Sequence, residues 1–332
     1  MATIPQIFRS KVDRLLERTP EFQETSKDIA HQIHQMVLDG GEQARQVADV
    51  LHGKQVGHPL HPILTDITIG SWALGTLFDF LALITFSSTM RKAANRLVMI
   101  GTATAIPTAL AGITDYSTIK QNAAQYGAAH GLLNSAAFYL YFRSLGARAR
   151  HSYLKAFLYS FFGLGFAVLA SWLGGDLVYR HRIGVNHAPP GEVDGWTPVM
   201  AADDLAEGEP TRVDVDEDTP VLLYRNGDAI HAIGAVCSHA GGPLEEGSFD
   251  GVCVQCPWHD SVFDLRDGQV VHGPATFEQP AYQTRVENGQ IEIRQQLPEI
   301  DPIIVQVETP MGPVNGRVDL NEVESETIVD TE

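Results

Sequence analysis

Cysteine is scarce in this sequence. Only Cys237, Cys253 and Cys256 occur among 332 residues. A disulfide framework uses paired cysteines spread along a chain, so an odd number gathered in one short stretch argues against one. The same clustering is typical of a metal site, and we therefore expect this stretch to hold a metal.

An apolar leader is also absent. The N-terminus reads MATIPQIFRSKVDRLLERTPEFQ and contains neither an apolar run nor adjacent arginines. Such a segment predicts no secretory or twin-arginine export signal. We expect the start of the chain to stay in the cytoplasm.

Basic residues are few beyond Pro189. There the chain has 6 Lys and Arg against 29 Asp and Glu, whereas residues 1–189 have 17 against 12, so the net charge changes from +5 to -23. This asymmetry predicts a membrane half joined to an acidic soluble half. An acidic surface repels phosphate, and no basic patch with interleaved aromatic residues occurs. Nucleic acid is therefore excluded as a partner.

Four apolar stretches lie in the first half of the chain. They cover residues 63–86, 97–113, 123–141 and 156–179. Each approaches the length that a hydrocarbon core requires, although Gln125, His130 and Asn134 interrupt the third. We predict a four-helix transmembrane bundle over residues 58–184. The amphipathic helical segment 1–57 is expected to pack on this bundle.

The second half of the chain has the alternating pattern of β-strands. After a linker at 185–192, short alternating segments occur at 219–224, 229–233, 282–286 and 290–293, with Asn-Gly turns among them. We predict a small antiparallel β domain over residues 193–295. The acidic composition of residues 296–332 predicts a disordered tail. The fold class is thus a helical membrane domain followed by an all-β domain.

The metal-binding pattern consists of two short motifs. Cys237-Ser238-His239 has the form C-x-H, and Cys256-Pro257-Trp258-His259 has the form C-P-x-H. Two thiolates and two imidazoles can bind tetrahedral zinc, so the spacing alone leaves zinc open. Cys253 belongs to neither motif and is expected to be a buried structural thiol.

These two motifs resemble those of the Rieske [2Fe-2S] family. The resemblance covers about residues 193–294 and continues through Phe263-Asp264, Asp267-Gly268 and Gly273-Pro274-Ala275, where the family has its proline loop. It implies a [2Fe-2S] cluster with Cys237 and Cys256 on one iron and His239 and His259 on the other. Neutral imidazoles in place of thiolates raise the reduction potential, so the histidine-bound iron is the one expected to be reduced.

The residues around the ligands narrow the role that the resemblance implies. Ser261 stands where high-potential Rieske proteins have a serine that donates to the cluster, but Phe263 replaces their tyrosine. Gly242 and Trp258 replace the cysteines of their disulfide. Pro274 lies in the proline loop next to the cluster. From these replacements we expect a low to middling reduction potential and no quinol-oxidising role like that of the bc complex.

The membrane half resembles an uncharacterised bacterial four-helix membrane domain. That resemblance rests on His58-Pro59-Leu60-His61-Pro62 at its start and on Gly174-Gly175-x-Leu-Val-Tyr at its end. With alternating spans, His58, His61, His130 and His181 fall near one membrane face. They predict either a b-type haem held by His61 and His130, a quinone site, or plain hydrogen bonding at the interface.

An even number of spans places both termini on one face. Seven basic residues near the spans, Arg148 among them, lie on the opposite face against five on this one, which favours the opposite face as cytoplasmic. The leader-free N-terminus and the cytosolic assembly of iron–sulfur clusters favour the reverse. We expect a multi-pass cell-membrane protein with both termini and the β domain in the cytoplasm.

These patterns together predict a membrane-anchored carrier of single electrons. Its donor and acceptor would be redox proteins or quinone. An oxygenase would need a large further domain with a two-histidine, one-carboxylate iron site, whereas only residues 296–332 remain and contain no histidine. No nucleophile elbow, P-loop or dinucleotide fingerprint indicates independent catalysis. A zinc-binding membrane scaffold and a redox sensor are the alternatives.

Overall fold

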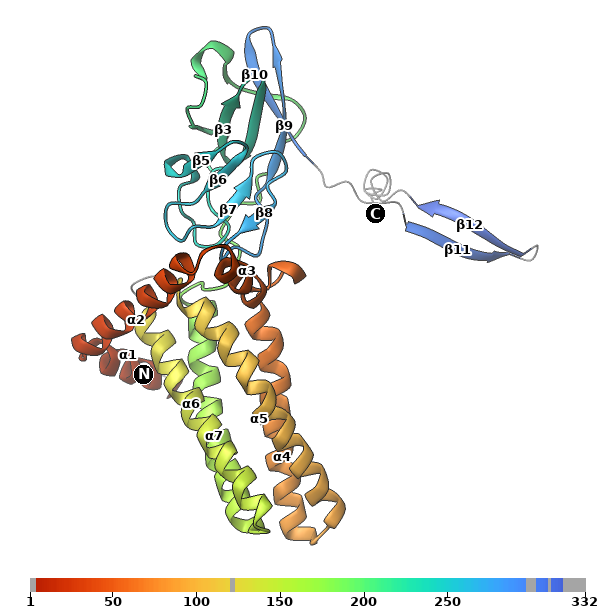
Figure 1. Ribbon diagram of the computed structural model, residues 1–332. Helices are drawn as coiled ribbons and strands as arrows, with labels where there is room; N and C mark the ends of the chain where they lie inside the picture. The colour runs from red at the N-terminus through yellow and green to blue at the C-terminus, as the bar shows by residue number, and fades with distance from the viewer. Residues whose placement is uncertain (1–3, 120–122, 297–302, 310–311, 319–332) are drawn as a thin grey trace.

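The computed structural model has a helical part, a β domain and a separate hairpin (Figure 1). It describes residues 4–119, 123–296, 303–309 and 312–318, and of residues 4–8, 303–309 and 312–318 it describes only the backbone. Three N-terminal helices lie beside and above a bundle of four long helices. The β domain sits on the end of the bundle where α3 lies.

The N-terminal helices begin and end at residues suited to those positions. They are α1 (Ile4–Glu17), α2 (Pro20–Asp39) and α3 (Gly41–His52). Pro20 occupies the first turn of α2, where its missing N–H costs nothing. Gly53 ends α3 with φ at 95°, and a Cβ there would lie 2.0 Å from the carbonyl oxygen of His58. Glycine therefore allows the chain to turn sharply from α3 into the bundle.

The bundle consists of two neighbouring helix pairs. Its members are α4 (Leu60–Thr85), α5 (Ser88–Tyr116), α6 (Ala124–Ala149) and α7 (Tyr153–Tyr179). Glycines allow close packing: a Cβ on Gly101 would lie 2.6 Å from the Trp72 ring, and one on Gly163 would lie 3.0 Å from the Tyr141 ring. Trp72 and Tyr141 themselves stack with their ring centroids 4.4 Å apart.

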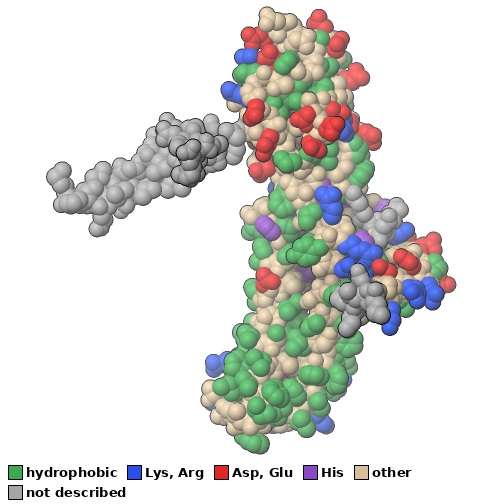
Figure 2. All heavy atoms as spheres, turned by 180° about the vertical axis from the view of Figure 1, so that it is seen from behind, with side chains coloured by type: hydrophobic (Ala, Val, Ile, Leu, Met, Phe, Trp, Pro, Cys, Tyr) green, Lys and Arg blue, Asp and Glu red, His purple; other side chains and the backbone are tan. Residues whose placement is uncertain are grey.

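Three of these helices have the length and apolar composition of membrane spans. They are α4, α5 and α7, whereas α6, the remaining helix of the bundle, is not apolar enough. Large apolar side chains such as Ile106 (56% exposed) and Val168 (60%) lie on the outside of the bundle. In Figure 2 hydrophobic side chains cover the lower bundle, while acidic ones gather over the β domain. Three apolar helices of sufficient length are thus present, and their crossing of a membrane and a fourth span stay predictions.

A buried ion pair crosses the bundle interior. Asp79 of α4 and Arg148 of α6 are each 6% exposed and form two hydrogen bonds, one of which measures 2.9 Å. Arg148 also donates to Asn95 and to Ser160. The count of basic residues used to predict orientation included Arg148 among those next to the spans, but this guanidinium is a buried partner of Asp79.

The β domain is built from two antiparallel sheets. The six-stranded sheet has the order β1-β10-β9-β4-β3-β2, and the four-stranded sheet has the order β5-β6-β7-β8. Leu222, Ile233, Leu244, Val254 and Phe263 form the core between them. The strands are β1 (Thr197–Ala201), β2 (Thr211–Asp214), β3 (Pro220–Asn226), β4 (Ala229–Gly234), β5 (Ser248–Asp250), β6 (Cys253–Gln255), β7 (Val262–Asp264), β8 (Val270–His272), β9 (Ala281–Glu287) and β10 (Gln290–Gln295).

The four strands expected from alternation are present as β3, β4, β9 and β10. The two Asn-Gly turns join β3 to β4 and β9 to β10, because Asn288 and both glycines adopt the positive φ that such hairpins need. The tail differs from its predicted disorder at β11 (Ile303–Thr309) and β12 (Gly312–Val318), which pair as a hairpin. The rest of residues 297–332 lies outside the described part.

Replacing Arg148 tests the buried pair. Arg148→Met leaves the Asp79 carboxylate buried and without its guanidinium, which destabilises the bundle by about 3–5 kcal/mol. The midpoint of thermal or denaturant unfolding in detergent measures this loss. Arg143→Met, which removes an exposed arginine from the same helix, should leave the midpoint unchanged. Adding Asp79→Leu to Arg148→Met should restore stability, and an unaltered midpoint in the single variant would show that the pair contributes nothing.

Candidate metal centre

Two loops at the α3 end of the β domain carry the predicted ligands. In the first cluster loop, residues 237–242, the N–H of Cys237 donates to the Gly242 carbonyl at 2.8 Å. In the second cluster loop, residues 256–261, the N–H of Cys256 donates to the Ser261 carbonyl at 2.8 Å. Each loop is therefore closed by its own backbone, which holds a cysteine and a histidine in a fixed relation.

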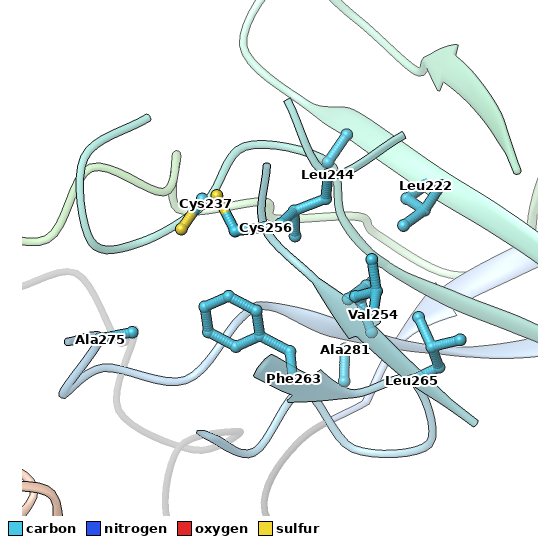
Figure 3. Packing of buried hydrophobic residues seen from close by; sticks show 11 residues of the cluster. Leu222, Cys237, Leu244, Val254, Cys256, Phe263, Leu265, Ala275 and Ala281 are labelled. Carbon is cyan, nitrogen blue, oxygen red and sulfur yellow. The ribbon is translucent and has the colours of Figure 1, made fainter. Parts of the chain in front are cut away.

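The two cysteines face each other across the loops. Cys237 is 1% exposed and Cys256 is 2% exposed, and Figure 3 shows their sulfur atoms side by side at the edge of the β-domain core. A hydrogen bond from the Cys237 thiol lowers the pKa of Cys256 to about 7, and the same pairing raises the pKa of Cys237. A thiolate is the form that binds metal, so the shift favours this form at Cys256.

The two histidines form a second pair beside the cysteines. The rings of His239 and His259 lie 5.0 Å apart, nearly perpendicular at 86°. The Nδ1 atoms of both rings are buried and make no hydrogen bond among the described residues. Buried ring nitrogens normally have a partner, so both atoms are placed as metal-binding atoms would be.

This arrangement in pairs suits two metal ions better than one. The two sulfur donors lie side by side, and the two imidazole rings form a separate pair. Closed tetrahedral zinc needs four donors around one point, whereas a [2Fe-2S] cluster takes two protein donors on each iron. The donor set therefore fits the cluster that the sequence predicted. These positions for Cys237, His239, Cys256 and His259 support the predicted ligand roles.

The three predicted neighbours of the cluster lie around the second loop. Ser261 is fully buried, and its Oγ accepts a hydrogen bond from the Ala275 N–H at 3.2 Å. Phe263 is fully buried beside the two cysteines (Figure 3). Pro274 is buried next to Gly273, which packs so closely that a Cβ would lie 2.7 Å from the Cα of Ser261. The proline loop thus packs tightly against the second cluster loop.

Two further residues differ from simple expectations. Cys253 lies in β6 and is only partly buried, so the prediction of a buried structural thiol was wrong in its burial. Trp258 is 46% exposed, although a Cβ on Gly242 would lie 3.1 Å from its ring. The bulky Trp258 and the bare Gly242 therefore fit together at the two positions where high-potential relatives are expected to have a disulfide.

The structure separates the four membrane-side histidines that the sequence grouped. The His58 ring lies 6.0 Å from Phe277 of the β domain, and the His181 ring lies 4.6 Å from Tyr126. Only His61 and His130 come together, with ring centroids 6.2 Å apart. The four residues therefore do not form one site.

The His61–His130 pair does not fit a haem in this arrangement. Nδ1 of His61 bonds to the Thr108 carbonyl at 2.9 Å, and Nδ1 of His130 bonds to the Ala170 carbonyl at 2.8 Å. The other nitrogen of His130 bonds to the Asn134 amide at 3.0 Å. Both rings also pack against glycines, because a Cβ on Gly112 would lie 2.7 Å from His61. With both nitrogens of His130 engaged, hydrogen bonding explains this pair.

The residues that hold the cluster loops against the helices were not among those predicted from the sequence. His34 Nε2 lies 3.0 Å from Asp260 Oδ2, and Thr118 Oγ1 lies 3.4 Å from His239 Nε2. A hydrogen bond with His34 lowers the pKa of Asp260. The partners are separated by 226 and 121 positions along the chain. No local pattern could have paired them.

Comparison with protein families divides the chain as the structure does. Residues 195–283 match the Rieske [2Fe-2S] domain, and residues 57–187 match a family described as Predicted membrane protein (DUF2231). Both resemblances expected from the sequence are therefore confirmed, as is their order.

Individual relatives match the β domain. The anthranilate 1,2-dioxygenase ferredoxin subunit of Burkholderia cepacia is 35% identical over 98 residues, which cover 30% of this chain and 90% of that protein. The ferredoxin component of the p-cumate 2,3-dioxygenase system of Pseudomonas putida is 37% identical and is covered to 80%, over 28% of this chain.

Among solved structures, the ferredoxin of carbazole 1,9a-dioxygenase from Nocardioides aromaticivorans IC177 is 32% identical, with a TM-score of 0.28. That match covers 31% of this chain and 100% of the ferredoxin. Each of these matches covers less than a third of this chain.

Removing one cysteine tests the ligand set. Cys256→Ser should eliminate bound iron and visible absorption, because one iron loses a thiolate ligand. Cys253→Ser is the matched control and should keep both, since Cys253 lies outside the two loops. Metal analysis and optical spectra of the purified full chain give the answer. A colourless protein that carries zinc would overturn the assignment and favour the scaffold alternative.

Proposed function

This chain belongs to the Rieske [2Fe-2S] family, and we propose that it carries single electrons between redox partners while anchored in the membrane. The observation that carries the proposal is the pairing of Cys237 with Cys256 and of His239 with His259 on two self-closed loops. A bound [2Fe-2S] cluster would supply a one-electron redox centre at this place.

The residues around the loops suit an electron carrier rather than a catalyst. The cysteine side is buried in the β-domain core, which excludes water from it. The histidine side lies at the surface of the domain. With the thiolates buried and the imidazoles at the periphery, an electron could enter and leave through the imidazole edge. No covalent bond of the protein would have to break or form.

The second cluster loop favours a potential below that of the quinol-oxidising relatives. Ser261 uses its oxygen lone pair to accept from Ala275, so its hydroxyl hydrogen can point toward the cluster. Phe263 has no hydroxyl to add a second such bond. Hydrogen bonds to cluster sulfur favour the reduced form, so one donor instead of two lowers the potential.

We infer the class of partner from the relatives. The matched proteins are ferredoxin components of dioxygenase systems, which supports a reductase as donor and a redox enzyme as acceptor. Quinone has less support. The cavity next to His259 has a volume of about 30 Å³, which holds roughly two water molecules. The relatives therefore favour a protein partner over a quinone.

Membrane anchoring is the second part of the proposal. It is supported by three apolar helices and by the match to a predicted membrane protein family. The proposal further includes four membrane spans, with α6 as the fourth. It also places the β domain in the cytoplasm. Anchoring would keep the cluster close to the bilayer and so restrict which partners it meets.

Reconstitution of the full chain in nanodiscs tests the carrier function. The cluster should be reduced by NADH through a soluble ferredoxin reductase and reoxidised by cytochrome c, with one electron per chain. Cys256→Ser should lose this turnover. Stopped-flow absorption measures both half-reactions. A cluster that titrates but exchanges no electrons with either protein would favour a sensor over a carrier. The same absorption spectra test for haem. A haem held by His130 would give a Soret band in the full chain, and His130→Ala would remove that band.

The Phe263 position gives a separate prediction. Phe263→Tyr places a hydroxyl near the cysteine pair and should raise the reduction potential by tens of millivolts, because the hydroxyl can donate to sulfur. A redox titration followed by paramagnetic resonance measures the shift. Phe249→Tyr, at a partly buried position packed against the same core, should not shift it. An unchanged potential in Phe263→Tyr would show that this position does not tune the cluster.

A further inference from the structure

The most extensive contacts that the function leaves unexplained join the β domain to the helices. Asp49 of α3 is 3% exposed, and each of its carboxylate oxygens has a partner in the β domain. Oδ2 lies 2.9 Å from Nδ1 of His272, and Oδ1 accepts the Gly273 N–H at 3.0 Å. Lys54 lies 3.6 Å from the same carboxylate and donates to the Val271 carbonyl. A buried carboxylate thus clamps the end of β8.

Each cluster loop also has a helical partner. Thr118, just after α5, lies against His239 of the first loop, and His34 of α2 pairs with Asp260, the neighbour of His259, in the second. Figure 1 shows α3 between the bundle and the lower ends of β7 and β8. We call the helical residues His34, Asp49, Lys54 and Thr118 the docking surface.

Charge supports this contact as a specific one. The chain beyond Pro189 has a net charge of -23, whereas the first 189 residues have +5. Arg45 lines the small cavity at the boundary together with Asp260 and His259. Arg45 and Lys54 are the basic helical side chains at this boundary, and they lie beside the acidic Asp49. Attraction between the two halves favours docking in this orientation.

Docking covers the histidine edge of the cluster site. His239 and His259 are only partly exposed where they lie against the helices, whereas Trp258 remains 46% exposed. An outside protein approaching the histidines would meet α2, α3 and the end of α5 first. Such a protein can reach the histidine edge only after the β domain has dissociated from the docking surface.

We propose that the docking surface is an internal partner for the histidine edge and competes with soluble redox proteins for it. This inference rests on the proposed electron-carrier function. The docked β domain faces its own membrane domain, and the undocked one serves an outside partner. Asp49 is the residue that holds the docked state, because its two charge-assisted hydrogen bonds are buried and directional.

Asp49→Asn tests the proposal, since it keeps the side-chain shape and removes the charge. Hydrogen–deuterium exchange of the full chain should show residues 45–56 and 271–275 exchanging at least about tenfold faster. Reduction by a soluble ferredoxin reductase should speed up by a similar factor. Lys54→Met should act in the same direction and serves if Asp49→Asn folds poorly. Asp39→Asn, an exposed carboxylate on α2, is the matched control and should change neither rate.

Two results would overturn the proposal. Unchanged exchange in both variants would mean that Asp49 and Lys54 do not hold the domains together. Faster exchange with unchanged reduction would mean that docking does not compete with an outside partner. The exchange measurement needs no cluster, so it tests docking even in a chain that fails to carry electrons. Failure of the proposed function and failure of docking are therefore distinguishable.

Discussion

The pairing of two thiols and two imidazoles across two closed loops is the constraint on which the rest of this protein depends. Such a donor set works only when both loops keep their shape and their separation. The backbone bonds within each loop provide the first requirement, and the core between the two sheets provides the second. Cys237 and Cys256 are themselves members of that core. Folding of the β domain and formation of the site are therefore one event.

The membrane domain solves a different physical problem with different means. Apolar side chains face outward, and several polar groups turn inward and bond to one another or to backbone carbonyls. The Asp79–Arg148 pair, the Thr68–Thr108 hydroxyl contact and the carbonyl bonds of His61 and His130 all follow this rule. The positions of His61 and His130 in the bundle are therefore accounted for by hydrogen bonding.

The β domain contacts the helical domain at the end that carries the cluster loops. The histidine edge, through which an electron would pass, lies against helices that lead into the bundle. A buried carboxylate at this boundary is costly unless it is fully bonded, and Asp49 is bonded on both oxygens. Such a contact fixes the position of the cluster site relative to the helical bundle. The length of the linker alone would not fix it.

The sequence by itself determined the chemistry and the order of the domains. Ligand residues close in sequence, such as Cys237 and His239, form a readable motif because the loop that holds them is local. Apolar length and strand alternation are likewise local, so the bundle and strands β3, β4, β9 and β10 were predictable. Only the tertiary structure decided which distant side chains meet. Asp49 and His272 are 223 positions apart, and Asp79 and Arg148 are 69 apart. Such pairs arise from packing, which no short-range pattern records.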